Sequence, residues 1–138
     1  EKLKAMILQR CEGIETETAK VKTVIPEIMA KWKEKTQARL DELKVDIDEN
    51  RLAKELAHIA QKTDVEEELD RLESHLDEIR RILESDKPVG RRLDFLMQEL
   101  HREANTLGSK SIDKQTTRAS VELKVLIEQA REQVQNIE

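Results

Sequence analysis

The stretch GRRLDFLMQELHREANTLGSKS, residues 90–111, decides the fold. Successive residues of a helix are turned by about 100°, and at that spacing the leucines, the methionine and an alanine of this stretch share one face. The other side is polar except for Phe95. The stretch therefore predicts an amphipathic helix that ends near Thr106, because Gly108 supplies a stop. Its predicted core face consists of Leu93, Leu96, Met97, Leu100, Ala104 and Leu107.

The sequence on the N-terminal side predicts four further helices. The first runs from the start of the chain to about Val24, because the ring of Pro26 disfavours helix in the residue before it. Pro26 then suits the first turn of a second helix, which reaches about Leu43. A short third helix precedes a fourth or is continuous with it, and Asp64 and Glu67 can cap the fourth helix reciprocally. The apolar stripes of the third and fourth helices are Leu52, Leu56 and Ile59, and Val65, Leu69, Leu72, Leu76, Ile79 and Leu83.

Residues 90–111 belong to a fifth helix, and a sixth follows it. Pro88 is the predicted start of the fifth helix, and Ser111 or Asp113 is the predicted start of the sixth. The sixth helix places its apolar side chains on one face as well. These are Ala119, Leu123, Leu126, Ile127, Ala130, Val134 and Ile137.

The composition agrees with an all-helical chain. Of the 138 residues, 40% are charged and 1% are aromatic, a mix typical of long helices and unsuited to strands. We therefore expect an elongated all-α unit of about six helices, arranged as long antiparallel hairpins and assembled into oligomers. Residues 1–62 and 63–138 are expected to be two regions of one structural unit.

Composition also limits the environment of the chain. Cys11 is the single cysteine, so no intramolecular disulfide can form. No apolar run approaches the roughly 18 residues of a membrane span. We expect a cytoplasmic protein with no membrane partner.

The charge is unevenly distributed. The chain carries a net charge of -5, but residues 80–118 hold nine basic against six acidic side chains, which gives that window +3. Such a basic stretch can steer a polyanion to one place. An ordinary solvated helix face explains the same fluctuation equally well.

Two polar stripes carry the candidate chemistry. Arginine offers a planar fork to phosphate, and carboxylates are the usual oxygen ligands of Mg²⁺ or Mn²⁺. An ion-pair network between subunits is the alternative that the pattern leaves open. On the fifth helix the polar side collects Arg91, Asp94, Phe95, Gln98, Arg102 and Asn105, with Arg92, Glu99 and Glu103 as a flank beside the core.

The fourth helix has a comparable flank, formed by Glu68, Arg71, His75 and Glu78. If the fourth and fifth helices pair antiparallel, the two flanks can face each other. His75 and several carboxylates could then hold one divalent ion or position a water for attack on phosphorus. A hydrogen-bonded structural histidine is the alternative. The chain lacks a Gly-rich phosphate loop, an HExxH pair and a nucleophile elbow, which leaves phosphodiester hydrolysis among the familiar chemistries.

Three runs of this sequence resemble one known family. They are DVEEELDRLESHLDEI at residues 64–79, the stretch at residues 90–111, and VELKVLIEQAREQVQNIE at residues 121–138. All three are similar to the C-terminal helical domain of YicC/YloC-like bacterial endoribonucleases, and residues 26–61 resemble the family less sharply. The resemblance makes residues 63–138 that domain and residues 1–62 a helical middle region. It also implies that the N-terminal half of the family protein is absent.

The resemblance implies a function as well. Members of the family are cytosolic endoribonucleases that form homo-oligomers, with a hexamer expected, and that cleave RNA with the help of a divalent metal, Mg or Mn. RNA, further copies of the chain and other RNA-decay enzymes are the implied partners. The alternatives are a non-enzymatic RNA-decay adaptor and a helical oligomerisation scaffold.

Pattern and resemblance together predict the site. The predicted catalytic residues are His75, Glu99 and Glu103, and the predicted metal ligands are the same three with Asp94. The residues predicted to bind RNA phosphates are Arg71, Arg91, Arg92, Gln98, Arg102, Asn105 and Lys110.

Overall fold

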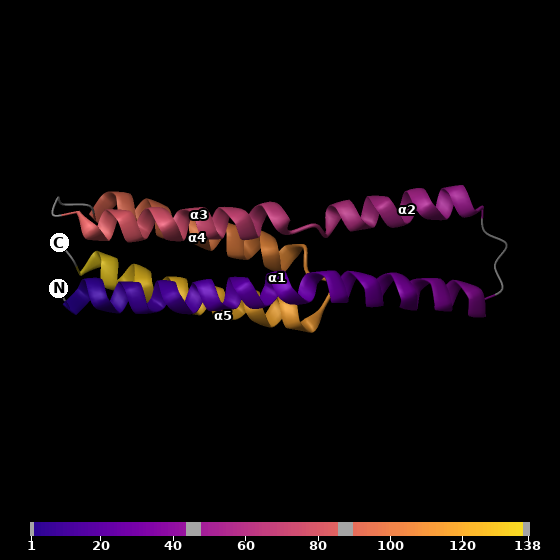
Figure 1. The fold of residues 1–138 in the computed structure, drawn as a ribbon, viewed down its shortest axis with the longest axis horizontal. Coiled ribbons are helices and arrows are strands. Elements are labelled where there is room, and N and C mark those ends of the chain that lie inside the picture. Colours follow the sequence, from indigo (N-terminus) through magenta and orange to yellow (C-terminus); the bar gives the residue numbers. More distant parts are fainter. Residues whose placement is uncertain (1, 44–47, 86–89, 137–138) are drawn as a thin grey trace.

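The computed structural model describes residues 2–43, 48–85 and 90–136. Within them the chain forms five helices, and the all-α prediction is confirmed. The molecule is elongated, and the first helix begins at the same end at which the last one finishes (Figure 1). No described helix combines the length and the apolar character needed to cross a membrane. The helices are α1 (Lys2–Glu42), α2 (Glu49–Lys62), α3 (Glu66–Glu84), α4 (Gly90–Ser109) and α5 (Lys114–Gln135).

α1 corrects the prediction of six helices. The first and second predicted helices are one continuous helix of 41 residues, with Pro26 inside it. Proline removes one backbone hydrogen bond and crowds the carbonyl four residues earlier, which usually kinks or ends a helix. Here Val21 and Ile28 are buried on either side of Pro26. Packing of the flanking turns therefore outweighs the local preference to stop.

Two aspartates mark helix starts as expected, although one cap differs in detail. Asp113 is the N-cap of α5, and its carboxylate accepts from Gln115 N at 2.7 Å. The Asp64 carboxylate accepts from Glu66 N at 3.0 Å just before α3. Asp64 N donates to Gln61 O at 3.3 Å, so it is not available to Glu67 for the predicted reciprocal cap.

Gly108 does not stop α4, which continues to Ser109. A Cβ at Gly108 would lie only 2.6 Å from Ser120 Oγ of α5. The Ser120 hydroxyl donates to the Ala104 carbonyl at 2.7 Å. The glycine therefore serves the close approach of α4 and α5 rather than the end of the helix.

Four helices form what we call the body: α3, α4, α5 and the first part of α1, residues 2–28. Close packing joins α4 to α5, α1 to α5, α3 to α4 and α1 to α3, so each helix has two neighbours. The apolar faces predicted for α3 and α4 are buried without exception. The faces predicted for α5 are buried too, apart from partly buried Leu126 and from Ile137, which lies outside the described residues. Pro88, the predicted start of the fifth helix, also lies outside them.

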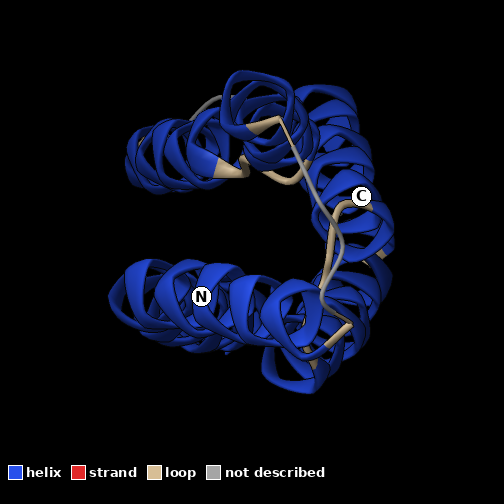
Figure 2. Cartoon of the chain, turned by 90° about the vertical axis from the view of Figure 1, so that its right-hand side faces the viewer, coloured by secondary structure: helices blue, strands red, loops and turns tan. Residues whose placement is uncertain are grey.

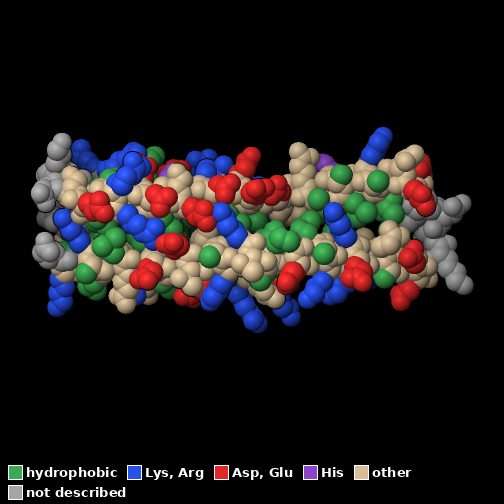
Figure 3. All heavy atoms as spheres, viewed as in Figure 1, with side chains coloured by type: hydrophobic (Ala, Val, Ile, Leu, Met, Phe, Trp, Pro, Cys, Tyr) green, Lys and Arg blue, Asp and Glu red, His purple; other side chains and the backbone are tan. Residues whose placement is uncertain are grey.

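The remaining helices form what we call the arm, residues 29–42 of α1 together with α2. No side chain of these two segments is buried, and Leu52, Leu56 and Ile59 of α2 are half-buried. α2 belongs to none of the close helix pairs found among the described residues. Viewed from the arm end, α2 and the facing half of α1 stand apart (Figure 2). Apolar side chains show between them on the surface in Figure 3.

Body and arm meet at one level of the molecule. Pro26 of α1 lines a surface pocket together with Asp64 and Val65, which lie between α2 and α3. The neighbouring Thr63 hydroxyl lies 3.7 Å from Met29 Sδ, and this contact links α1 to the end of α2. The proline and the break between α2 and α3 therefore sit side by side at the junction.

Candidate functional site

The facing flanks of α3 and α4 form a line of ion pairs, which we call the α3–α4 seam. Lys110 Nζ lies 2.5 Å from Glu68 Oε1 at one end of it. Arg71 Nε lies 3.0 Å from Glu103 Oε2 in the middle. Arg92 pairs with Glu78 towards the other end. Residues at the start of α3 thus contact residues at the end of α4, so the two helices are antiparallel. Their polar flanks face each other, as predicted.

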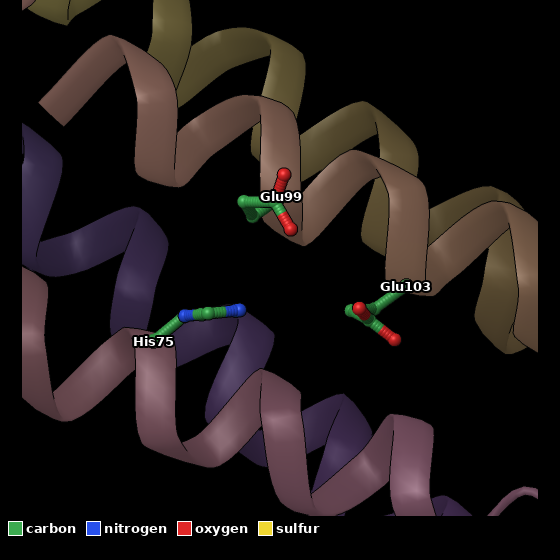
Figure 4. Close-up of side chains that lie close together, drawn as sticks. All are labelled: His75, Glu99 and Glu103. Carbon is green, nitrogen blue, oxygen red and sulfur yellow. The ribbon is translucent and has the colours of Figure 1, made fainter. Parts of the chain in front are cut away.

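His75, Glu99 and Glu103 come together in this seam. One ligand atom from each side chain can be chosen so that all three atoms lie within 4.8 Å of one another. Glu99 and Glu103 are one helical turn apart on α4, and His75 points towards them from α3 (Figure 4). Glu103 is 6% exposed, whereas His75 and Glu99 are half-buried and open to solvent on one side. We call these three residues the His–Glu–Glu group.

Arg71 holds one carboxylate of this group in place. Its Nε donates to Glu103, and this hydrogen bond, aided by the charges of Glu103, Glu68 and Glu67, raises the pKa of the Arg71 guanidinium. Arginine therefore remains charged beside the group. A carboxylate that is hydrogen-bonded on one side is fixed in orientation, as metal-ligating carboxylates are.

Asp94, the fourth predicted metal ligand, lies elsewhere. Its Oδ1 accepts from Arg131 Nε of α5 at 3.0 Å, and its Oδ2 accepts from Gln98 Nε2 at 2.9 Å. The structure therefore places Asp94 and Gln98 on the α5 side of α4 and not with the His–Glu–Glu group. Arg131 had no place in the sequence-based site, because nothing in its local pattern sets it apart from other arginines.

The other predicted phosphate-binding residues of α4 divide between the seam and the outer surface. Arg92 stands at the seam, and its guanidinium carbon lies 5.4 Å above the centre of the exposed Phe95 ring. Arg91, Arg102 and Asn105 are exposed on the outer side of α4. The Asn105 amide nitrogen lies 3.2 Å from His101 Nδ1, so it is linked along its own helix rather than across the seam.

Glu68, like Glu78, is a seam residue that sequence reasoning left out of the site, and Glu68 is the more buried of the two. Its side chain is 2% exposed, and its Oε2 is buried without a hydrogen-bond partner among the described residues. A solitary buried carboxylate is costly unless cations compensate it. Its spacing of three residues from Arg71 and seven from His75 was the signal that could have selected it.

Comparison with known proteins identifies the family. The family model "Endoribonuclease YicC-like, C-terminal" matches residues 21–138. A protein of Haemophilus influenzae named "Probable endoribonuclease YicC" is 48% identical over 138 residues, which is 100% of this chain and 48% of that protein. A protein of Clostridioides difficile with the same name is 40% identical over 140 residues, covering 99% of this chain and 48% of that protein. The chain therefore spans about half the length of these relatives, and it belongs to the YicC-like endoribonuclease family.

Proposed function

We propose that this chain supplies a divalent-metal site for the cleavage of RNA phosphodiester bonds, with the His–Glu–Glu group as its ligands. The observation that carries the proposal is the convergence of His75, Glu99 and Glu103 within 4.8 Å across two helices. Carboxylate oxygens suit Mg²⁺ and Mn²⁺, and an imidazole nitrogen favours a transition metal. The mixed donor set therefore fits Mn²⁺ better than Mg²⁺.

The residues of the chain would divide the work around such an ion. When bound, a divalent ion polarises a phosphoryl oxygen and makes a water more acidic. Arg71 keeps the Glu103 carboxylate oriented, which fixes one ligand before the ion arrives. His75 and Glu99 are only half-buried, so the group remains open to a substrate on its solvent side.

The relatives' names support RNA as the substrate class, since both are called probable endoribonucleases. Because the chain covers about half of each relative, the activity of a whole protein and its assembly into a homo-oligomer, a hexamer included, are part of the proposal.

A second function is favoured by the ion pairs themselves. Glu103, Glu68 and Glu78 each have a basic partner in the seam, as expected of a purely structural network between two helices. In that case the chain is a helical scaffold or a non-enzymatic RNA-decay adaptor. The distinguishing property is metal binding, because a structural network needs no ion.

The first experiment measures Mn²⁺ binding to the 138-residue chain by titration calorimetry. We expect one ion per chain, and we expect Glu99→Gln and His75→Ala each to weaken binding at least about tenfold, as the loss of a ligand should. Asp94→Asn is the matched control, because Asp94 lies on α4 but pairs with Arg131. It should leave the affinity unchanged.

The second experiment measures RNA cleavage by the chain and by the longest natural form of the protein that contains it. We expect cleavage that a chelator stops, that Mn²⁺ restores, and that Glu99→Gln abolishes while Asp94→Asn preserves it. Absence of Mn²⁺ binding, or full cleavage in excess chelator, would show that the proposal is wrong and would favour the structural role.

A further inference from the structure

We propose that Glu68 organises a phosphate-binding subsite, formed by Arg71 and Lys110, next to the His–Glu–Glu group. The subsite would take a backbone phosphate of RNA beside the one that reacts. For its substrate class this inference rests on the proposed function. Its evidence is separate, because it comes from the part of the seam that lies beyond Glu103.

Glu68 is almost completely buried. Its Oε1 lies 2.5 Å from Lys110 Nζ and 3.8 Å from Arg71 Nη2, while its Oε2 has no hydrogen-bond partner in the described part of the chain. Because the side chain is only 2% exposed, water cannot solvate the charge of this carboxylate. Glu68 therefore holds both cations near itself.

Arg71 is anchored by only one of its nitrogens. Nε donates to Glu103 at 3.0 Å, whereas Nη1 lies 3.6 Å from Glu67 and Nη2 lies 3.8 Å from Glu68. The last two distances exceed that of a normal hydrogen bond. With a side chain that is 47% exposed, Arg71 presents a fixed fork to solvent. Such a fork matches two oxygens of a phosphate.

Lys110 can donate a further hydrogen bond. Its ammonium donates to the Asp64 carbonyl at 3.1 Å and to Glu68, and a lysine has three donors. Its side chain is 32% exposed. Both cations approach the same oxygen of Glu68, so they lie within reach of a single phosphate group. Cations that are held in place lose little freedom on binding, which favours affinity.

The position of the subsite indicates its use. Arg71 contacts Glu103, so the subsite adjoins the His–Glu–Glu group along the seam. A phosphate held there would align an RNA strand with the neighbouring linkage at the group. Binding energy from such a non-reacting part of a substrate can be used to position the reacting part.

The test measures binding of a 2′-O-methyl oligouridine, which resists cleavage, to the 138-residue chain in excess chelator. We expect Arg71→Gln and Lys110→Gln each to weaken binding about tenfold, since a hydrogen bond to a charged group is lost. Each should also lower the slope of log affinity against log salt by roughly 0.7, the value for one phosphate contact on a single strand. Each variant keeps a side-chain amide that can donate to the neighbouring buried carboxylate, so it should fold, and circular dichroism checks this before binding is measured.

The role of Glu68 is tested by placing Lys110→Gln in two backgrounds. In the Glu67→Gln background, Lys110→Gln should still weaken oligonucleotide binding about tenfold, because Glu67 is 84% exposed and does not touch Lys110. In the Glu68→Gln background, Lys110→Gln should weaken oligonucleotide binding less than about threefold, because the charge that holds Lys110 beside Arg71 is already lost. Both backgrounds remove one negative charge near Arg71, so the comparison isolates positioning.

Each outcome bears on the proposal. Unchanged affinity and salt slope in Arg71→Gln and Lys110→Gln, or equal costs in the two backgrounds, would overturn it, and so would the absence of oligonucleotide binding. If Glu68→Gln melts at a lower temperature, Glu68→Asp and Glu67→Asp replace the two backgrounds. Both keep the charge, and only Glu68→Asp withdraws the carboxylate from Lys110, so the cost of Lys110→Gln should again be smaller there. The assay contains no metal and involves no cleavage. The subsite proposal can therefore be correct when the proposed nuclease function is wrong, and the nuclease function can be correct when the subsite proposal is wrong.

Discussion

The body and the arm are built from the same kind of helix, yet only the body buries its apolar faces. In the body each helix packs against two neighbours, and side chains such as Leu72, Leu93 and Leu100 are fully buried. In the arm, α2 has an equally clear apolar stripe, but the side chains of that stripe are only half-buried. An amphipathic helix needs a partner for its stripe, and a pair of helices does not provide enough cover.

The difference also explains where the candidate site is. The α3–α4 seam holds its side chains in fixed relation because the core behind it fixes both helices. His75 is flanked on α3 by buried Leu72 and Leu76, and Glu103 is followed on α4 by buried Ala104. Converging ligands need such rigid support. The arm offers no comparable support among its described residues.

The largest expected effect compares one leucine from each region. Leu100→Ala in the body should lower the free energy of unfolding by about 3 kcal/mol, because it removes a fully buried side chain and leaves a cavity. Leu56→Ala in the arm should cost about 1 kcal/mol or less, because Leu56 is only half-buried. Urea unfolding followed by circular dichroism measures both.

Equal costs for the two leucines would remove the distinction between body and arm. That result would mean that α2 packs as firmly as α4. Leu93→Ala, also fully buried in α4, is the matched repeat for the body and should behave as Leu100→Ala does.

The second prediction uses the buried thiol of the body. Burial raises the pKa of Cys11 from its usual 9.0 to about 11. As the pH rises, the thiol of the unfolded chain therefore loses its proton before the buried thiol does. The free energy of unfolding should be constant below pH 9 and should fall by about 2 kcal/mol as the pH rises from 9 towards 11. The measurement is the free energy of unfolding of the wild type minus that of Cys11→Ala across this range, which cancels the titration of the lysines.

An exposed thiol in the arm serves as the control. Ala57→Cys, placed on the exposed side of α2 in the Cys11→Ala background, should show no such loss relative to Cys11→Ala. A constant difference between wild type and Cys11→Ala from pH 8 to 11 would contradict the burial of Cys11 in the body.

The smallest effect compares two aspartate caps of similar geometry. Asp113 caps α5 in the body and Asp48 caps α2 in the arm, and each accepts a backbone N–H two residues later. Asp113→Ala should lower the free energy of global unfolding by about 1 kcal/mol. Asp48→Ala should leave global unfolding unchanged and instead speed amide hydrogen exchange within α2. A shift in global unfolding with Asp48→Ala would show that the arm folds together with the body.

Much of the body was predictable from the sequence, because helical spacing alone identifies a buried face. The stripes of α3 and α4 were predicted residue by residue, and Asp113 was one of the two residues predicted to begin the last helix. The predictions failed where a distant part of the chain decides the local conformation. Pro26 lies inside a helix because of packing around it, and Gly108 admits Ser120 from another helix.

The candidate site shows the same division. The spacing of His75, Glu99 and Glu103 predicted which flanks they occupy, and an antiparallel pair of helices then brings them together. The same spacing could not show that Asp94 pairs with Arg131, since that contact depends on how α5 crosses α4. Nor could it show that Glu68 is buried, because a residue at the edge of a stripe is covered or exposed according to the neighbouring helix.

The length of α1 has a mechanical consequence. The helix is one rod that passes from the body into the arm, and its proline stands where the two regions meet. Beyond Pro26 the rod extends about 24 Å, so a bend of about 10° at that point displaces its far tip by about 4 Å. The His–Glu–Glu group lies on α3 and α4 and has no residue on α1. The length of α1 beyond Pro26 therefore converts a small change of angle at the junction into a larger displacement at the tip of the arm.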